Sequence, residues 1–398
     1  RQMCIRDRYK KVVIESESAS KHSAIRRKNL RLILDLYRKN NFSTYQISKQ
    51  LNLSSGGAKK LVDDIVEGGI LTRTVAQREG IHGRYPITYG INPNYGFIAI
   101  INFATKELLS LSLNGTLLEN VKLDIGENIS DENIYKIGEI TQSLADKWLK
   151  RNIPLLAIAI AYIGKLHTVT YEKYMSGIFK NCSINLYQYF KEKFEVDVIL
   201  QNDLHFAILA EQKYGILTGK ELSCCYLQIG RGCAASYLID NKLYVGATGL
   251  AGEIGHNCVL GSNKVVENFV DWISVQAKIQ EKTGKQLQLE TAVGYYNSGD
   301  SAVCSVVDEA AQYAGVIIKN LTELMDFDII ILSGPMTEFG ARYMENLKKS
   351  FYQYGNFYVQ IVRSALGEES IGMGAFEMAR DVIFDKFIES RLSGNDFE

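Results

Sequence analysis

The sequence predicts an α/β protein in which an N-terminal winged helix-turn-helix precedes a larger body of alternating strands and helices. Three observations lead to this prediction. Short helical patterns and a small hairpin fill residues 24–92, and buried-strand patterns alternate with helices from about Tyr95 onward. A segment with four glycines, residues 245–256, adds the features of a ligand-binding loop, because glycine lets backbone lie close to a ligand.

Length and composition are those of a globular protein with two or three domains. The chain has 398 residues, of which 46% are hydrophobic and 23% charged. It has no apolar run of the roughly 18–20 residues that a membrane span needs, and it does not open on a signal-peptide pattern. Its seven cysteines include no Cys-x-x-Cys pair. We therefore expect a cytoplasmic protein with reduced thiols, no bound metal and no membrane contact.

The net charge of zero conceals a segregation of charge along the chain. Residues 21–84 carry 13 Lys and Arg against 5 Asp and Glu, whereas the chain after Arg84 carries 27 against 37. A basic module joined to an acidic body is typical of a nucleic-acid-binding protein with a separate sensing domain. The alternative is that the bias only reflects solvated helix faces.

The winged helix-turn-helix is predicted over residues 24–92. Residues 1–23 show no apolar period and are set aside as a disordered or non-native leader. The first helix carries an apolar stripe at i, i+3, i+4 and i+7, formed by Leu30, Ile33, Leu34 and Tyr37. Ser43 and Gln46 form a capping box that begins the second helix.

The third helix begins after its N-cap Ser54 and ends at Gly68-Gly69, and strands at 70–75 and 87–91 then form the wing. Polar residues of this helix and wing are the candidates for DNA contact: Ser54, Ser55, Lys59, Lys60, Arg73, Arg78 and Arg84. Cations at these places meet phosphates when the third helix enters the major groove. They favour DNA binding over the alternative of a three-helix protein-interaction module.

Gly56-Gly57, in the first turn of the third helix, is the unusual feature of this module. Glycine destabilises a helix by about 1 kcal/mol per position and offers no side chain to a base edge. We therefore expect base contacts to rest on Ser55 and Lys59. Arg84, in the extended segment Gly83–Pro86, is placed to reach into a narrow minor groove.

The first half of the body is predicted to hold four strands and two helices. The strands fall at 97–103, 108–113, 155–161 and 196–200, and the helices at 134–150 and 186–194. The last strand leads into Gln201-Asn202-Asp203, and α/β sheets place ligand groups at such strand ends. The alternative is that Asn202 and Asp203 only cap the end of the strand.

The second half is predicted to hold strands at 224–229 and 329–332, and helices at 265–279, 305–325, 336–351 and 372–392. Within the glycine-rich segment, Glu253 and His256 stand three residues apart. Both can accept a hydroxyl proton, so the pair suits a ligand with many hydroxyl groups. The alternative is an ordinary glycine-rich turn whose Glu and His are solvated.

Together these motifs resemble the ROK family of repressors and sugar kinases, in its transcriptional-repressor branch. The resemblance covers roughly residues 25–392, and its most specific part is Gly252-Glu253-Ile254-Gly255-His256. It also rests on residues 53–62, Gly83–Pro86, Gln201–Asp203, Ser333-Gly334 and Gly372–Ala375.

The resemblance implies a body of two actin-like (ribonuclease H-like) lobes with a sugar in the cleft between them. The first lobe would comprise 93–200 plus 380–398, and the second 201–379 with the sugar-site loop and the dimerisation surface. The resemblance carries sugar-binding roles onto the matching residues Asn202, Asp203, Glu253, His256 and Glu267. Asp203 occupies the position that serves as catalytic base in the family's kinases.

Two departures from the family pattern bear on function. The family's kinases have Asp-x-Gly-Gly-Thr at the nucleotide loop, where this chain has Asn102-Phe103-Ala104-Thr105, so we expect neither ATP binding nor phosphoryl transfer. The family's zinc loop has the pattern Cys-x-Cys-Gly-x-x-Gly-Cys, whereas residues 257–266 offer only Cys258 beside His256. Zinc needs three or four protein ligands, so we expect no zinc and no other cofactor.

The sequence therefore predicts a sugar-responsive DNA-binding transcription regulator without enzyme activity, a repressor of carbohydrate-utilisation genes. Its partners would be a double-stranded DNA operator, a sugar or sugar-phosphate effector, and a second copy of the chain in a homodimer, with a tetramer as the alternative. Two other functions stay open. One is a ligand-independent DNA-binding regulator whose body only dimerises, and the other is an active sugar kinase fused to a DNA-binding module.

Overall fold

The computed structural model describes residues 21–74, 87–167, 169–172, 177–259, 261–353, 355 and 357–393. Its first part, called the head here, consists of α2 (Lys21–Tyr37), α3 (Thr44–Gln50), α4 (Ser55–Glu67), β1 (Leu71–Thr74) and β2 (Thr88–Ile91). The strands β1 and β2 pair antiparallel, and Phe42 adds a bridge to Tyr89. The predicted winged helix-turn-helix is confirmed.

The head is held together by the apolar stripe that the sequence predicts. Leu30, Ile33 and Leu34 of α2 are fully buried, as are Val62 and Ile65 of α4. Both predicted caps form: Ser43 and Gln46 make the capping box of α3, and the Ser54 hydroxyl accepts a hydrogen bond from the backbone N–H of Gly57 at 3.1 Å. Such acceptors stabilise a helix because its first N–H groups have no partner within the helix.

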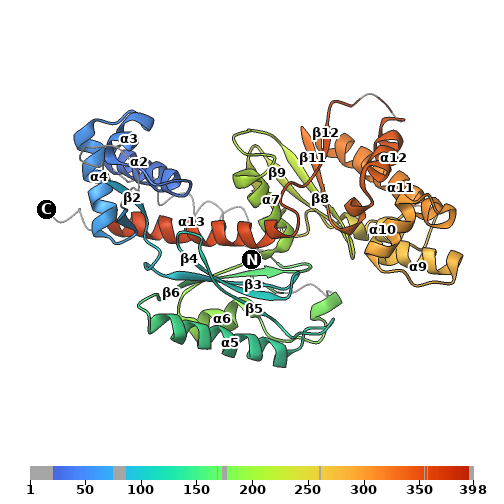
Figure 1. Ribbon diagram of the computed structural model, residues 1–398, viewed down its shortest axis with the longest axis horizontal. Helices are drawn as coiled ribbons and strands as arrows, with labels where there is room; N and C mark the ends of the chain where they lie inside the picture. Colours follow the sequence, from blue (N-terminus) through green and yellow to red (C-terminus); the bar gives the residue numbers. More distant parts are fainter. Residues whose placement is uncertain are drawn as a thin grey trace, which may run out of the picture.

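The first lobe is built on a five-stranded sheet in the order β5-β4-β3-β6-β7. Its strands are β3 (Phe97–Asn102), β4 (Glu107–Ser112), β5 (Leu117–Lys122), β6 (Leu155–Tyr162) and β7 (Asp197–Asn202). β3, β6 and β7 are parallel, whereas β4 and β5 join as antiparallel strands. Helices α5 (Asp131–Leu149) and α6 (Leu186–Phe194) cover one face of this sheet (Figure 1).

The second lobe repeats this arrangement in the order β10-β9-β8-β11-β12. Its strands are β8 (Cys224–Ile229), β9 (Cys233–Ile239), β10 (Lys242–Tyr244), β11 (Ile329–Ser333) and β12 (Gln360–Arg363). On its outer side lie α8 (Glu267–Val270), α9 (Trp272–Thr283), α10 (Leu289–Asn297), α11 (Ser301–Met325) and α12 (Gly340–Tyr352). Two sheets with the same strand order confirm the predicted two-lobed, actin-like body.

Two helices fill the space between the sheets, α7 (Asp203–Tyr214) and α13 (Glu369–Ser393). The strand β3 shows how the layers are separated, because its side chains alternate between two cores. Ile98 and Ile100 belong to the core that includes α7 and α13, whereas Ala99 and Ile101 belong to the core under α5 and α6. The division of α13 between the lobes near residue 380 stays a prediction.

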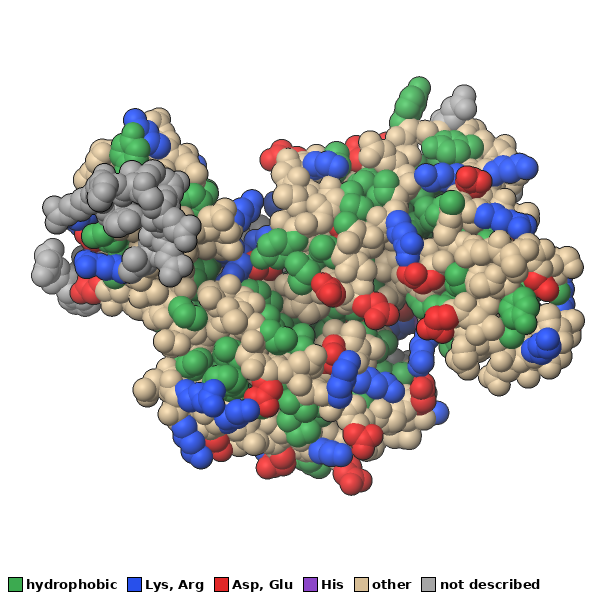
Figure 2. All heavy atoms as spheres, viewed as in Figure 1, with side chains coloured by type: hydrophobic (Ala, Val, Ile, Leu, Met, Phe, Trp, Pro, Cys, Tyr) green, Lys and Arg blue, Asp and Glu red, His purple; other side chains and the backbone are tan. Residues whose placement is uncertain are grey.

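The helix α13 also carries the head at its C-terminal end (Figure 1). Arg31 of α2 and Arg38, the residue after α2, form ion pairs with acidic residues of α13, among them Asp381 and Asp385. The end of α4 packs there too, because a Cβ at Gly68 would overlap the ring of Phe387. In the space-filling view the head projects from the body and a hollow separates it from the second lobe (Figure 2).

Within the described part of the chain, α11 is the one helix whose length and apolar composition would suit a membrane span. It packs against α12 and α9, and Val306, Val307 and Ile318 are almost fully buried among their side chains. The apolar composition of α11 is thus that of a core helix.

Several elements differ from the sequence-based prediction. The sequence predicts neither the helix α7 after Asp203 nor the elements β5, β9, β10, β12 and α10. The helix predicted at 265–279 is interrupted at Asp271, whose carboxylate accepts from the N–H of Ser274 and caps α9. The helix predicted at 336–351 opens with the 3-10 turn η3 (Pro335–Phe339) before α12 begins at Gly340.

Candidate functional site

Asn202 and Asp203 lie where β7 ends and α7 begins. Asn202 is the N-cap of α7: its Oδ1 accepts from the N–H of Leu204 at 2.9 Å, and its Nδ2 donates to the carbonyl oxygen of Gly164 at 3.1 Å. The capping alternative for this pair is therefore partly realised, since both polar ends of Asn202 have partners within the protein. Asp203, by contrast, is 6% exposed, and among the described residues its carboxylate accepts hydrogen bonds only from N–H groups at the helix start.

The glycine-rich loop brings Glu253 and His256 to the same place from the second lobe. Gly252 has φ +97°, and a Cβ there would overlap the carbonyl oxygen of Ala235 on β9. The loop is thus pressed onto β9, and the 3-10 turn η2 (Ile254–His256) follows at once. The Nε2 atom of His256 lies 3.9 Å from Oε2 of Glu253, and the imidazole side chain is 54% exposed.

Glu267, the first residue of α8, completes the group. Its Oε2 lies 3.1 Å from the position of a Cβ built on Gly255 and 3.4 Å from one built on Gly232, so the two glycines leave it room. The electrostatic influence of both Glu253 and His256 reaches its carboxyl group. The structure therefore brings together all five residues that the resemblance implies.

Burial and mutual repulsion control the protonation of these acids. Burial, reinforced by the charge of Glu253, raises the pKa of Asp203 from 3.8 to about 7. Burial likewise raises the pKa of Glu267, while His256 and Lys165 act in the opposite direction. A carboxyl group that titrates near neutral pH can either donate a hydrogen bond to a bound hydroxyl group or accept one from it.

Lys165 is a member of the group that sequence analysis missed. It comes from the loop after β6 in the first lobe, and its Nζ lies 3.6 Å from Oε2 of Glu253 in the second. Nothing in the local sequence marks it, because only the fold brings the two loops together. A small recess beside it is lined by His167 and Tyr171 of the first lobe and by Gly249 of the glycine-rich loop. Residues of both lobes thus form the candidate sugar site.

In the turn at Asn102-Phe103, the backbone donors are occupied by the protein itself. Asn102 is 2% exposed, and its Oδ1 accepts from the N–H groups of Ala104 at 3.0 Å and Thr105 at 3.3 Å. These are the backbone donors that a phosphate loop would offer to its ligand. The Phe103 ring is buried against Phe179 with the ring centroids 5.0 Å apart.

The second glycine turn, Gly230–Gly232, is also occupied by the protein itself. The N–H of Gly230 donates to the carbonyl oxygen of Gly232 at 2.8 Å, and the carbonyl oxygen of Gly230 accepts from the N–H of Trp272 at 2.8 Å. Arg231 forms an ion pair across the cleft with Glu127 of the first lobe at 3.1 Å. This pair is a contact between the lobes in addition to that of Lys165 with Glu253.

The segment 257–266 does not fit a zinc ion. Backbone hydrogen bonds close it as a small hairpin, from Val266 N–H to Asn257 and from Val259 N–H to Lys264, with a bridge between Cys258 and Val265. Cys258 is exposed, and no group of three or more His, Cys, Asp or Glu within the described ranges is arranged to hold a metal. Backbone hydrogen bonds therefore hold this loop in shape.

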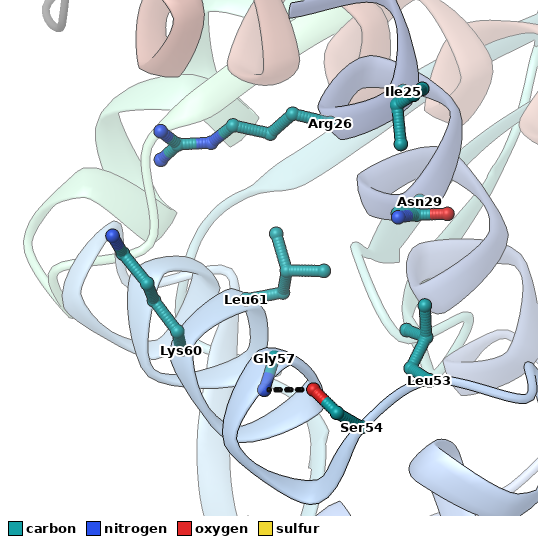
Figure 3. A pocket seen from close by; sticks show the side chains of 8 residues that line it. All are labelled: Ile25, Arg26, Asn29, Leu53, Ser54, Gly57, Lys60 and Leu61. Carbon is teal, nitrogen blue, oxygen red and sulfur yellow. Dashed lines mark hydrogen bonds between the residues drawn. The ribbon is translucent and has the colours of Figure 1, made fainter. Parts of the chain in front are cut away.

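On the head, five of the predicted DNA contacts lie within the described residues. Ser54, Ser55, Lys59, Lys60 and Arg73 are all exposed. Between α2 and α4 lies a hollow lined by Arg26, Asn29, Gly57 and Lys60, with Arg26 and Lys60 extending toward the same end (Figure 3). Arg78 and Arg84 lie outside the described residues, so their placement stays a prediction.

The basic residues of the head fall into two groups, those that form ion pairs and those that do not. Arg26, Arg27, Arg31 and Arg38 form ion pairs with acids of the head itself or of α13. Lys59 and Lys60, in contrast, form no ion pair with any described residue. The interpretation of the whole surplus as a DNA-binding charge was too broad, because part of it attaches the head to the body.

Comparisons of sequence and of structure find known proteins that are similar to most of this chain. Over 389 residues the chain is 24% identical to the xylose repressor of Caldicellulosiruptor bescii, which spans 90% of this chain and 96% of that one. A ROK family transcriptional regulator described as a homolog of the E. coli MLC protein superposes with a TM-score of 0.71 at 16% identity, covering 88% of this chain and 94% of that one.

The body alone is also similar to kinases. A ROK family glucokinase from Streptomyces griseus superposes with a TM-score of 0.60 at 18% identity, covering 72% of this chain and 100% of that one. These likenesses of structure establish the fold of the body. The sequence model of the ROK family matches residues 108–382, a range that includes the candidate site residues between Asn202 and Glu267. The chain therefore belongs to the ROK family.

Proposed function

We propose that this protein is a cytoplasmic, sugar-responsive DNA-binding transcription regulator that represses carbohydrate-utilisation genes as a homodimer. The observation that carries the proposal is the continuity between two sites. The winged helix rests on α13, α13 packs along α7, and α7 begins at Asp203 in the candidate sugar site. The named relatives support the same role, since one of them is a xylose repressor.

The effector is expected to be a neutral sugar or a sugar phosphate. Asp203, Glu253 and Glu267 offer carboxylate groups, and Lys165 and His256 offer donors, so the cleft can bind many hydroxyl groups at once. Because Lys165 and Glu253 belong to different lobes, a ligand between them changes the contact that links the lobes. We propose that this change reaches the head through α7 and α13.

Several contacts at the far end of α7 provide the path. Tyr214, the last residue of α7, donates a hydrogen bond to Glu377 of α13, and Lys213 lies 3.7 Å from Asp381. Glu377 and Asp381 in turn bind Arg38 of the head. A shift of α7 against α13 therefore acts directly on the charges that hold α2, and a change in head position alters half-site spacing in a dimer.

In the experiment, the full-length wild-type protein is used to select a duplex from a random DNA library. The affinity for that duplex and the melting temperature are then measured with a panel of pentoses, hexoses and their phosphates. We expect one sugar to lower operator affinity by at least tenfold and to raise the melting temperature. Glu253→Gln abolishes both effects, whereas the control Glu309→Gln, on the exposed face of α11, keeps them.

Two results separate the alternatives. If a specific duplex is selected but every sugar leaves affinity and melting temperature unchanged, the body only dimerises and the sensing role is wrong. If no duplex is selected above non-specific binding, the DNA-binding role itself is wrong.

We also propose that the protein lacks kinase activity, on the evidence of the occupied turn at Asn102. The two N–H groups that would bind a phosphate already donate to the Asn102 side chain. A coupled assay with ATP and the sugar identified by thermal shift is expected to show no turnover. ATP consumption that disappears in Asp203→Asn would instead establish the kinase alternative.

A further inference from the structure

The first turn of α4 contains two adjacent glycines on the exposed surface of the head. Glycine in a helix is unfavourable relative to alanine, because it loses more backbone freedom on folding and has no side chain to shield the helix. Each of the two positions therefore needs a physical reason. The structure supplies one for Gly57 but none for Gly56.

Gly57 is required by the cap of its own helix. A Cβ at this position would lie 2.9 Å from Oγ of Ser54, the atom that accepts the hydrogen bond from Gly57 N–H (Figure 3). Any side chain here would push the capping hydroxyl away. The absence of a Cβ at Gly57 thus preserves the start of α4.

Gly56 has no such role within the fold. A Cβ built on it meets no atom within 4 Å, and its φ does not lie in the left-handed region. An alanine would therefore fit without strain and would stabilise the helix. Nothing in the described part of the molecule needs a glycine at this position.

The surroundings of Gly56 indicate what does need it. It lies on the face of α4 opposite to Ala58, Val62 and Ile65, which are fully buried. The exposed side chains nearest to it along α4 are Ser55, one position before it, and Lys59 and Lys60, three and four positions after it. In a helix-turn-helix the N-terminal residues of the second helix contact the base edges in the major groove.

We propose that Gly56 is a specificity-determining residue, at which the DNA approaches the α4 backbone more closely than a Cβ atom allows. The close approach lets the flanking side chains of Ser55 and Lys59 reach the bases, and it excludes sequences whose groove atoms lie too far from the helix. This inference rests on the proposed DNA-binding function and names the residue that fixes the depth of α4 in the groove.

The test uses Gly56→Ala in the full-length chain, with a duplex that the wild-type protein has selected. Gly294→Ala is the matched control, because Gly294 is also an exposed helical glycine, in α10, whose Cβ would meet no atom within 4 Å. Both variants are expected to melt at the wild-type temperature or about 1 °C above it.

Only Gly56→Ala is expected to lose affinity for the selected duplex, by about tenfold at fixed salt concentration. The dependence of its affinity on salt should match that of wild type, since the phosphate contacts keep their charges. Gly56→Ser should lose affinity to a similar extent, because the added Cβ is common to both variants.

An affinity of Gly56→Ala within twofold of the wild-type value would overturn the inference. A fall in the melting temperature of Gly56→Ala would also overturn it, because the fold itself would then need the glycine. Failure of the wild-type protein to select any duplex would instead count against the proposed DNA-binding function. The two failures are therefore distinguishable.

Discussion

Arg38 of the head and Glu377 of α13 form a buried ion pair, with Nη1 of the arginine 2.7 Å from Oε2 of the glutamate. The two side chains are only 5% and 2% exposed. Glu377 also accepts hydrogen bonds from Arg380 and from Tyr214 at the end of α7. A buried charge left without its partner is strongly unfavourable, so these groups hold one another in a single arrangement. The pair joins the head, the last helix and the helix that starts at the candidate sugar site.

Replacement of Arg38 by methionine should loosen the head from the body. The change removes partners of both Glu377 and Asp381 and should lower the free energy of unfolding by about 3 kcal/mol. Scanning calorimetry is expected to show the head melting below the body. The control Arg27→Met removes an exposed pair with Glu389 and should change stability by less than about 0.5 kcal/mol. One unshifted transition in Arg38→Met would contradict this.

Asp203 should make the protein less stable as the pH rises toward 8. Its pKa is raised by burial from 3.8 to about 7, so the folded state holds a proton that the unfolded state has released. The stabilisation is complete below about pH 4 and is lost as the pH rises through about 7.

Urea unfolding at pH 5 and pH 8 provides the measurement. Between these values wild type should lose about 2 kcal/mol more than Asp203→Asn, whose amide does not titrate. Parallel pH profiles for the two proteins would show that Asp203 is ionised throughout the range.

Gly252 should tolerate no side chain. In Gly252→Ala the methyl group would overlap the carbonyl oxygen of Ala235, and φ is +97° in addition. We expect a loss of about 3 kcal/mol in unfolding free energy and of the thermal shift caused by the sugar. Gly284→Ala separates the two causes, since Gly284 has φ +70° but open space around it. It should lose only about 1 kcal/mol. Equal losses would show that the contact with β9 is unimportant.

Metal chelation should leave the protein unchanged. The segment 257–266 is closed by backbone hydrogen bonds, and Cys258 lies exposed on it. Treatment with EDTA, followed by metal analysis, is expected to release no stoichiometric zinc and to leave the melting temperature and the sugar response as they were. A fall in melting temperature that added zinc reverses would show that metal ligands were missed.

The sequence was sufficient for features that depend on local chemistry. The stripe from Leu30 to Tyr37 and the caps at Ser43 and Ser54 appear as predicted, because helix periodicity and capping are determined within a few residues. The alternation of strands and helices followed from apolar runs such as 155–161, whereas the two lobes were implied by the family resemblance. The five candidate sugar-site residues came from the family resemblance, and their common location follows from the fold.

Features that depend on distant parts of the chain were not predictable. Lys165 stands in an unremarkable loop, and only the meeting of the two lobes gives it Glu253 as a partner. Nothing in the local sequence indicates that Arg31 and Arg38 pair with α13, more than 300 positions away along the chain. The helix α7 was missed because buried residues, polar ones such as His205 and Glu211 among them, occur all around it, so its sequence shows no apolar period.

The seat of the head on α13 has a consequence for protein engineering. A chimera made by exchanging residues 21–92 alone would leave Asp381 and Asp385 facing a foreign surface, since their partners Arg31 and Arg38 leave with the old head. The unit that can be transferred is therefore discontinuous in the gene. A head moved to another body must be accompanied by the last turns of α13, because otherwise it is linked covalently but lacks the contacts that couple it to the body.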